Sequence, residues 1–292
     1  MSRSAIAFIF SFIFTFIGLK ILINIFKKHK FFQPVRFDVP LDHFRKKRNI
    51  PTLGGLVCYL SILFSSLFFC DLKDIYMWSV LLLITLFACV GLDDDLMKLS
   101  SHSSNGIKGE VRLLLEVLFC GLTIMLLTQG DSTITNEKTV FIPLIKYTMY
   151  IGVLIIPFFI FVVVGSSNAV NLTDGLDGLA IFPIMLSAFG LFIIAIFSGY
   201  GIDAKFIKTL NFDNPSELAV MCSSVIGSGL AFLSFNRYPA RVFMGDVGSL
   251  MFGAFLGITA VCLRYEVFFA IIGLVFVVEA LSDIIQVSSL KM

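Results

Sequence analysis

A run of three carboxylates stands out in an otherwise apolar chain. Asp93, Asp94 and Asp95 follow one another, and Lys98 lies about one helical turn later. Adjacent carboxylates repel one another and resist joint ionisation unless they share a proton or a cation. Two carboxylates together with phosphate oxygens are a usual arrangement around Mg²⁺. The run therefore indicates a magnesium and phosphate site, and the alternative is an ordinary solvated helix end.

A second polar segment, Asn168–Gly178, is more specific. Its polar side chains recur at every third position, at Asn168, Asn171, Asp174 and Asp177. If the segment begins as a helix, the first three side chains share one face. Polar groups between two strongly apolar runs are costly without a function, so a binding role is favoured over a mere connecting loop.

The third polar stretch runs from Asn236 to Ser249 and contains Asp246 at the edge of an apolar run. A lone carboxylate there could complete a metal site begun by Asp94 and Asp95. The alternative is that Asp246 is an ordinary N-cap of the following helix.

The amino-acid composition indicates that the protein lies in a membrane. The chain is 58% hydrophobic and 14% charged, whereas a soluble domain carries roughly 25% charged residues. Too little polar surface exists to cover a water-soluble globule, so a bilayer is expected as solvent. The six cysteines form no Cys-x-x-Cys pair, which argues against a disulfide framework or a zinc site. No nucleic-acid partner is expected.

About nine membrane-spanning helices are predicted, because a helix needs about 20 apolar residues to cross the hydrocarbon core. The expected spans are 5–26, 53–70, 76–92, 112–129, 141–164, 179–199, 217–235, 243–262 and 267–289. We therefore expect an all-α, polytopic membrane protein with a single integral membrane domain over residues 1–292.

Lys and Arg are concentrated in alternate loops. The loop after the first span is strongly basic, and the third and seventh loops add Lys98, Lys108, Arg237 and Arg241. The positive-inside rule makes these loops cytoplasmic and leaves the N-terminus outside. The same alternation puts all three polar motifs on the cytoplasmic side. A site facing the cytoplasm is therefore expected.

Two long stretches carry a family resemblance: Asn168–Ala180 (NAVNLTDGLDGLA) and Phe235–Leu250 (FNRYPARVFMGDVGSL). They resemble the bacterial phospho-N-acetylmuramoyl-pentapeptide transferases, within the polyprenyl-phosphate sugar-1-phosphate transferase superfamily. The match continues through Gln33–Arg36, Pro51–Gly55 and Val277–Leu281, and so covers most of the chain.

The resemblance implies an activity at the bacterial inner membrane. It implies Mg²⁺-dependent transfer of phospho-MurNAc-pentapeptide from UDP-MurNAc-pentapeptide to undecaprenyl phosphate, giving lipid I and UMP in peptidoglycan synthesis. The partners are then the nucleotide-sugar donor, the lipid acceptor and the bilayer, and the resemblance also allows a homodimer.

The family pattern Gly-x-x-Asp-Asp-x-x-Lys aligns with this chain from Gly91 and makes Asp93 an extra acid. The resemblance implies that the paired acids act near the lipid phosphate, either by assisting direct attack or by forming a covalent aspartyl intermediate. The candidate catalytic residues are Asp94, Asp95, Lys98 and Asp174; the candidate substrate-binding residues are Asn168, Asn171, Asp177 and Asn236; the candidate metal ligand is Asp246.

The chain departs from the family pattern in two places. Asn105 and Glu110 stand where the family has basic residues, although Arg112 is nearby. Family members also continue past the ninth span into a His-rich cytoplasmic loop and a tenth span, and we expect this sequence, which ends at Met292, to lack both.

Three alternatives remain open at this point. A sibling transferase would use another UDP-sugar, and a truncated, non-catalytic remnant would bind donor or lipid without turnover. A transporter could relay ions through intramembrane acids such as Glu279 and Asp283. The absence of an evident internal repeat makes the transporter the weakest of the three.

Overall fold

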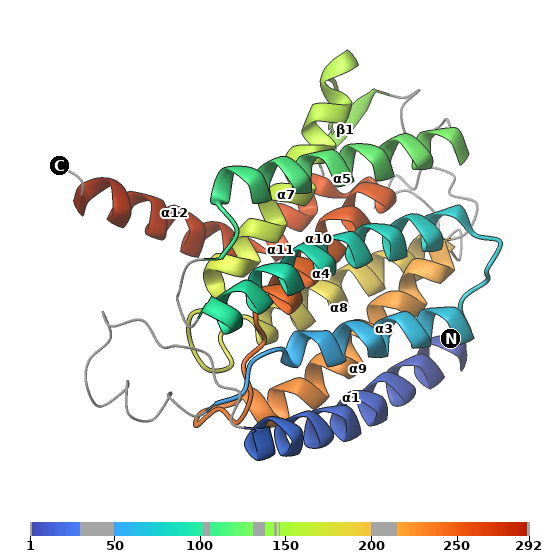
Figure 1. Ribbon diagram of the computed structural model, residues 1–292. Coiled ribbons are helices and arrows are strands. Elements are labelled where there is room, and N and C mark those ends of the chain that lie inside the picture. Colours follow the sequence, from blue (N-terminus) through green and yellow to red (C-terminus); the bar gives the residue numbers. More distant parts are fainter. Residues whose placement is uncertain are drawn as a thin grey trace.

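The protein is a bundle of helices in the computed structural model, which describes residues 2–29, 50–101, 106–130, 138–142, 145, 147–199 and 215–290 (Figure 1). Its elements are α1 (Ser2–His29), α3 (Gly54–Phe69), α4 (Ile75–Ser101), α5 (Gly109–Gly130), β1 (Thr139–Ile142), β2 (Tyr147–Tyr150), η2 (Gly152–Leu154), α7 (Ile155–Thr173), α8 (Ile181–Gly199), α9 (Pro215–Asn236), α10 (Asp246–Leu263), α11 (Glu266–Ile272) and α12 (Leu274–Leu290).

Within the described ranges, seven helices are long and apolar enough to cross a membrane: α1, α4, α5, α7 with η2, α8, α9 and α10. The apolar helix α3 is shorter, at 16 residues. The predicted all-α fold of a polytopic membrane protein is confirmed by these elements.

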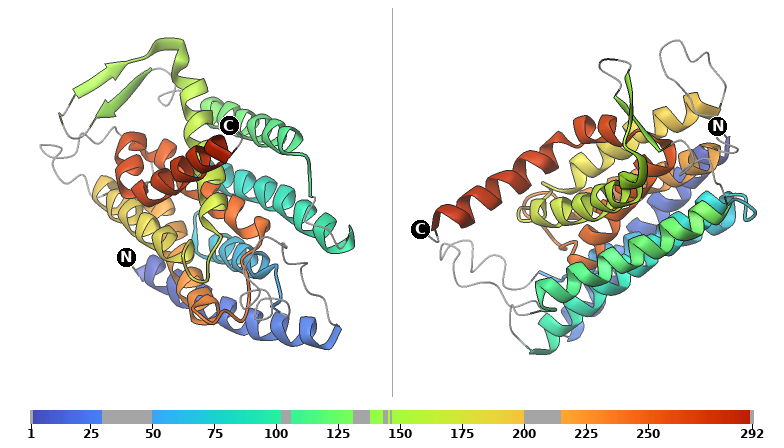
Figure 2. Two further views of the ribbon diagram at one scale, coloured as in Figure 1. Left: turned by 90° about the vertical axis from the view of Figure 1, so that its left-hand side faces the viewer. Right: turned by 90° about the horizontal axis from the view of Figure 1, so that it is seen from above.

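The structure differs from the predicted spans in four places. The helices α4 and α7 continue past the expected ends at 92 and 164, to Ser101 and Thr173, so the motifs expected in these two loops begin inside helices. The span expected over 141–164 starts later, at Ile155, because Thr139–Ile142 and Tyr147–Tyr150 pair as an antiparallel hairpin. Both strands are made of β-branched, aromatic and other apolar residues that favour extended backbone, which explains the hairpin. The span expected over 267–289 is divided at Gly273 into α11 and α12, and α12 reaches away from the bundle (Figure 1 and Figure 2, right).

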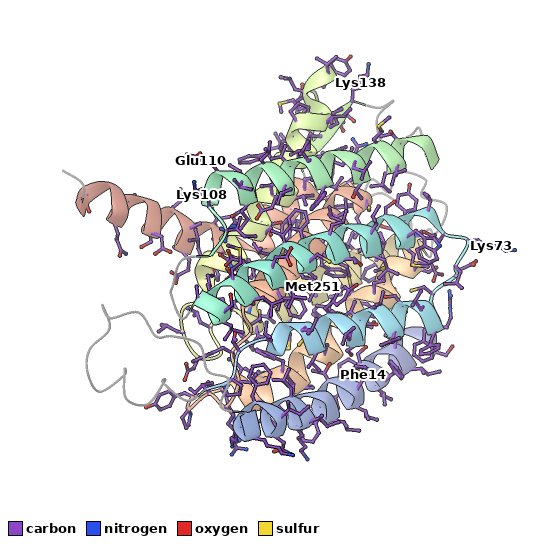
Figure 3. The ribbon with its side chains drawn as sticks, in the orientation of Figure 1. Phe14, Lys73, Lys108, Glu110, Lys138 and Met251 are labelled. Carbon is purple, nitrogen blue, oxygen red and sulfur yellow. The ribbon has the colours of Figure 1, made fainter. Side chains whose placement is uncertain are left out.

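The centre of the bundle is α10. Ninety-four per cent of its apolar stretch is buried inside the protein, compared with 28% for α1 and for α5. It packs against α3, α4, α7 and α8, and Met251 from its middle lies deep among the side chains (Figure 3). Peripheral helices can therefore face lipid while α10 forms the core.

Small residues bring α10 and α7 close together. Gly253 and Gly257 form a Gly-x-x-x-Gly pair, and a Cβ atom on Gly253 would approach Ser167 Cα within 2.5 Å. Two serines of α7 donate hydrogen bonds to carbonyls of α10: Ser166 Oγ to Gly253 O at 2.7 Å and Ser167 Oγ to Leu250 O at 3.0 Å. Close backbone approach and interhelical hydrogen bonds are the usual means of helix association in lipid.

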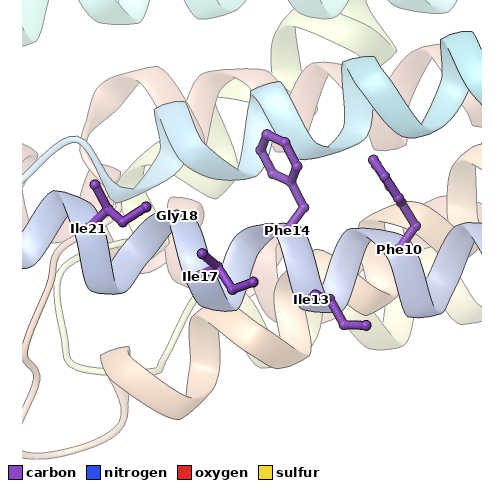
Figure 4. Close-up of a pocket in the computed structure, with 6 residues that line it drawn as sticks. All are labelled: Phe10, Ile13, Phe14, Ile17, Gly18 and Ile21. Atoms are coloured by element: carbon purple, nitrogen blue, oxygen red, sulfur yellow. The ribbon is translucent and has the colours of Figure 1, made fainter.

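On the other side of the bundle, hydroxyl groups join α1, α3 and α9. The Oγ atoms of Ser65 and Ser224 lie 2.8 Å apart, as do Thr15 Oγ1 and Ser228 Oγ. The outward face of α1 carries Ile9, Ile13, Ile17, Ile21 and Ile25, each about half exposed. A shallow apolar pocket lies on this face, beside Phe10 and Phe14 (Figure 4). Such a surface suits contact with acyl chains.

The two ends of the bundle differ in chemistry. At the end opposite the polar motifs, Arg3 of α1 makes a double hydrogen bond to the buried carboxylate of Glu217 at 2.8 and 3.1 Å. Glu217 also accepts the N–H of Asp71, near the exposed Lys73 (Figure 3). These contacts tie α1, α9 and the α3–α4 connection together. The polar motifs gather at the other end, where α4 finishes and α10 begins.

The packing of α7 on α10 yields a first prediction. Gly253→Ala should lower the melting temperature of the detergent-solubilised protein, because overpacking of this kind costs about 1–3 kcal/mol. The matched control is Gly165→Ala in α7, since a Cβ atom there meets nothing within 4 Å. Equal melting temperatures for the two variants would contradict the proposed role of the Gly253 contact.

Candidate active site

Glycines set the frame of the site by letting backbones touch. A Cβ atom on Gly91 of α4 would overlap the carbonyl of Asp246, the first residue of α10. Gly54 and Gly55, at the start of α3, donate their N–H groups to the carbonyls of Phe243 and Met244 at 2.9 and 2.8 Å. Helix α4 is thereby held against the first residue of α10, and the start of α3 is held against the loop before α10.

The central feature is an ammonium group shared by two carboxylates. Lys98 Nζ lies 2.5 Å from Asp94 Oδ2 and 2.7 Å from Asp246 Oδ2. The remaining oxygens are also bonded: Ile107 N donates to Asp94 Oδ1 at 2.6 Å, and Asn171 Nδ2 donates to Asp246 Oδ1 at 3.0 Å. Three of the candidate residues from two distant helices therefore form one cluster.

The three consecutive aspartates have different surroundings. Asp94 and Asp95 are buried, at 2% and 1% exposure, whereas Asp93 is exposed. Asp95 Oδ2 accepts the N–H of Val247 at 3.2 Å, at the start of α10. Its other oxygen, Oδ1, is buried and accepts no hydrogen bond from the described residues. Asp95 thus joins the two helices and also presents one carboxylate oxygen that is free to accept a proton or a cation.

Helix α7 brings its two asparagines to the same cluster, as the helical start of the segment predicted. Asn171 Nδ2 bonds Ser249 Oγ at 2.8 Å in addition to Asp246. Asn168 Oδ1 accepts a hydrogen bond from Arg112 Nη2 at 3.2 Å. Arg112 Nη1 in turn lies 3.7 Å from Asp246 Oδ2. Asn171 therefore contacts Asp246 directly, and Asn168 contacts Arg112 beside it.

Two other motif residues hold loops together. Asn236 Oδ1 accepts the N–H of Gly178 at 2.9 Å, and its Nδ2 donates to Val242 O at 2.9 Å. Asp177 Oδ2 accepts the N–H of Ala240 at 3.1 Å. The turn after α7 and the loop before α10 are thus fastened to each other. A contact of Asn236 or Asp177 with a substrate stays a prediction.

Asp174 lies where α7 ends, and its backbone N–H donates to Val170 O and Asn171 O. Its side chain is half-buried. Its catalytic role stays a prediction.

Sequence reasoning missed Glu116. This residue of α5 is fully buried, and its Oε2 accepts a hydrogen bond from Asn168 Nδ2 at 2.5 Å. Its Oε1 lies 3.6 Å from Arg112 Nε. A signal was present in the sequence, because a carboxylate inside an apolar span, one turn after an arginine, predicts a functional or paired group.

The carboxylates of this cluster are possible ligands for a divalent cation. In the part of the chain that the structure describes, no three acidic, His or Cys side chains form a ready metal cluster. Mg²⁺, however, is usually held by one or two carboxylates together with substrate phosphates. Asp94 and Asp246 already share a cationic group, and Asp95 Oδ1 lacks a donor. These residues therefore fit a divalent cation completed by phosphate oxygens.

The formal charges agree with that fit. Four carboxylates, those of Asp94, Asp95, Asp246 and Glu116, surround two cationic side chains, Lys98 and Arg112. The set thus holds two more acidic than basic side chains, and a divalent cation would balance it.

Comparison with known proteins points in the same direction as the geometry. Residues 77–264 match the model of the family described as glycosyl transferase family 4. The chain is 43% identical over 276 residues to phospho-N-acetylmuramoyl-pentapeptide-transferases from two strains of Francisella tularensis subsp. tularensis, FSC 198 and WY96-3418. The alignments cover 93% of this chain and 75% of each relative. The chain therefore belongs to the phospho-N-acetylmuramoyl-pentapeptide transferases of glycosyl transferase family 4.

Proposed function

We propose that this enzyme transfers phospho-MurNAc-pentapeptide from UDP-MurNAc-pentapeptide to undecaprenyl phosphate, with lipid I and UMP as products. The observation that carries the proposal is the ammonium of Lys98 held between Asp94 and Asp246 at one end of an apolar helical bundle. A cluster of this kind suits a reaction between a soluble diphosphate and a lipid phosphate. The names of the relatives support the choice of donor.

In the proposed reaction an oxygen of undecaprenyl phosphate attacks the sugar-bound phosphorus of the donor. The bond from that phosphorus to the bridging oxygen breaks, and UMP leaves with the bridging oxygen. Asp95 Oδ1, the buried oxygen without a donor, is the proposed acceptor of any proton remaining on the lipid phosphate. A covalent aspartyl intermediate is the other route that these carboxylates allow.

The proposed cofactor is Mg²⁺, with Asp246 as its main ligand and Asp94 beside it. When bound, it would offset the charge of the donor diphosphate as that charge moves to the leaving group. Lys98, whose ammonium lies beside both carboxylates, would then be available to a phosphate oxygen. Asn171 keeps Asp246 oriented through its hydrogen bond at 3.0 Å.

We propose that the site faces the cytoplasm. The proposal rests on the concentration of Lys and Arg in the loops at this end of the chain's spans. It also suits a donor that carries a nucleotide, because such a donor is too polar to cross the bilayer.

The proposed activity predicts the outcome of a transfer assay. The purified chain, given undecaprenyl phosphate and UDP-MurNAc-pentapeptide, should form lipid I with Mg²⁺ and none after chelation. The products are measured by chromatography of the labelled lipid. Preference for UDP-GlcNAc over the pentapeptide donor would indicate a sibling transferase instead. Donor binding without any product would indicate a non-catalytic protein.

The metal assignment predicts the effect of Asp246→Asn. Loss of this carboxylate should lower turnover by at least about 10²-fold, since charge stabilisation of this kind supplies several kcal/mol in the transition state. The melting temperature should change little, because asparagine removes the charge but keeps an oxygen that can accept a hydrogen bond from Lys98. Asp93→Asn removes the same charge from an exposed neighbour of the cluster and should retain full activity. Wild-type turnover by Asp246→Asn would refute the assignment.

A further inference from the structure

Glu116 is a charged group without an assigned role in the reaction. It lies inside the apolar helix α5 and is fully buried. Burial of a carboxylate is expensive unless the group is paired and hydrogen-bonded. Its neighbours should therefore show what the charge does.

The carboxylate of Glu116 fixes the orientation of Asn168. Asn168 Nδ2 faces two acceptors, Glu116 Oε2 at 2.5 Å and Val164 O at 3.0 Å. An amide oxygen in that place would repel both acceptors, so the nitrogen has to lie there. The amide oxygen is consequently turned toward Arg112, where it accepts from Nη2 at 3.2 Å.

The guanidinium of Arg112 is thereby held by two residues, Asn168 and Glu116. Asn168 Oδ1 bonds its Nη2, and Glu116 Oε1 lies 3.6 Å from its Nε. Its Nη1 lies 3.7 Å from Asp246, and 23% of the side chain remains exposed. A planar guanidinium held in this way is suited to bidentate binding of phosphate.

We propose that Glu116 is a positioning residue for the donor's diphosphate, acting through Arg112. The inference rests on the proposed function, because that function supplies the diphosphate. Glu116 holds the guanidinium away from full contact with Asp246 and orients its exposed N–H groups toward the incoming phosphates. Without the buried carboxylate, Arg112 moves onto Asp246, where it competes with the divalent cation and leaves the diphosphate weakly held.

A purely structural role for Glu116 makes a different prediction. In that case the carboxylate only fastens α5 to α7, and its loss destabilises the protein whether or not Arg112 is present. The positioning role requires Arg112. Whether the effect of losing the Glu116 carboxylate depends on Arg112 therefore distinguishes the positioning role from the structural role.

The experiment measures binding of UDP, as a diphosphate probe, to the full chain in detergent with Mg²⁺, by titration calorimetry. Glu116→Gln keeps the shape and a hydrogen-bond acceptor for Asn168 but removes the charge facing Arg112. We expect about tenfold weaker binding of UDP, the usual effect of losing one charge-assisted contact. We also expect a higher Mg²⁺ concentration for half-maximal binding.

Glu110→Gln is the matched control, since it removes the same charge from the same helix at an exposed position near the N-terminus of α5 (Figure 3). It should bind UDP as the wild type does. In an Arg112→Ala background, adding Glu116→Gln should cause no further loss.

The outcomes distinguish a positioning role of Glu116 from the alternatives. Wild-type affinity in Glu116→Gln would overturn the positioning role and leave the proposed function intact. An equal loss with and without Arg112, together with a lower melting temperature, would assign Glu116 a structural role instead. Failure of the wild-type chain to bind UDP would count against the proposed donor itself, and the role of Glu116 would fall with it.

Discussion

The site depends on one ammonium group placed between two carboxylates. Asp94 and Asp246 come from α4 and α10, and both would repel each other at the close approach that Gly91 permits. Lys98 lies 2.5 Å from one and 2.7 Å from the other, which converts the repulsion into an attraction between the two helices. The same contact explains how the carboxylate of Asp94 can be buried where α4 meets the start of α10. A carboxylate pair without a cation would be too costly in this place.

The remaining polar residues divide into two groups around this contact. Asn236 and Asp177 bond backbone groups of neighbouring loops, so they fix the shape of the site. Asn171 and Arg112 approach Asp246 itself, so they control its orientation and charge. A single motif can therefore contain both kinds of residue. The Asn168–Gly178 segment supplies one from each group: Asn171 in the last turn of α7 and Asp177 in the turn that follows.

Much of this arrangement follows from the sequence because lipid imposes simple rules. Spans need long apolar stretches, and alternation of loops predicts which motifs share one end of the bundle. The contact of Lys98 with Asp246 confirms that two of the motifs meet. The β1–β2 hairpin was not predicted, since the short apolar strand β1 lies just before the apolar run of α7 and hydropathy alone does not separate the two. The pairing of Lys98 with Asp94 follows from their i, i+4 spacing on one helix. Sequence alone could not show that Lys98 also reaches Asp246, because that contact depends on the rotation of α4 against α10.

The position of the cluster at the end of the bundle has a physical reason. Charges in the middle of a bilayer are expensive, whereas charges at helix ends can reach water and headgroups. The almost fully buried α10 begins at Asp246, so the cluster lies at the end of this central helix. Its peripheral neighbours offer apolar faces to the acyl region. A lipid whose phosphate lies at headgroup level can therefore meet a soluble diphosphate there without either substrate leaving its own solvent.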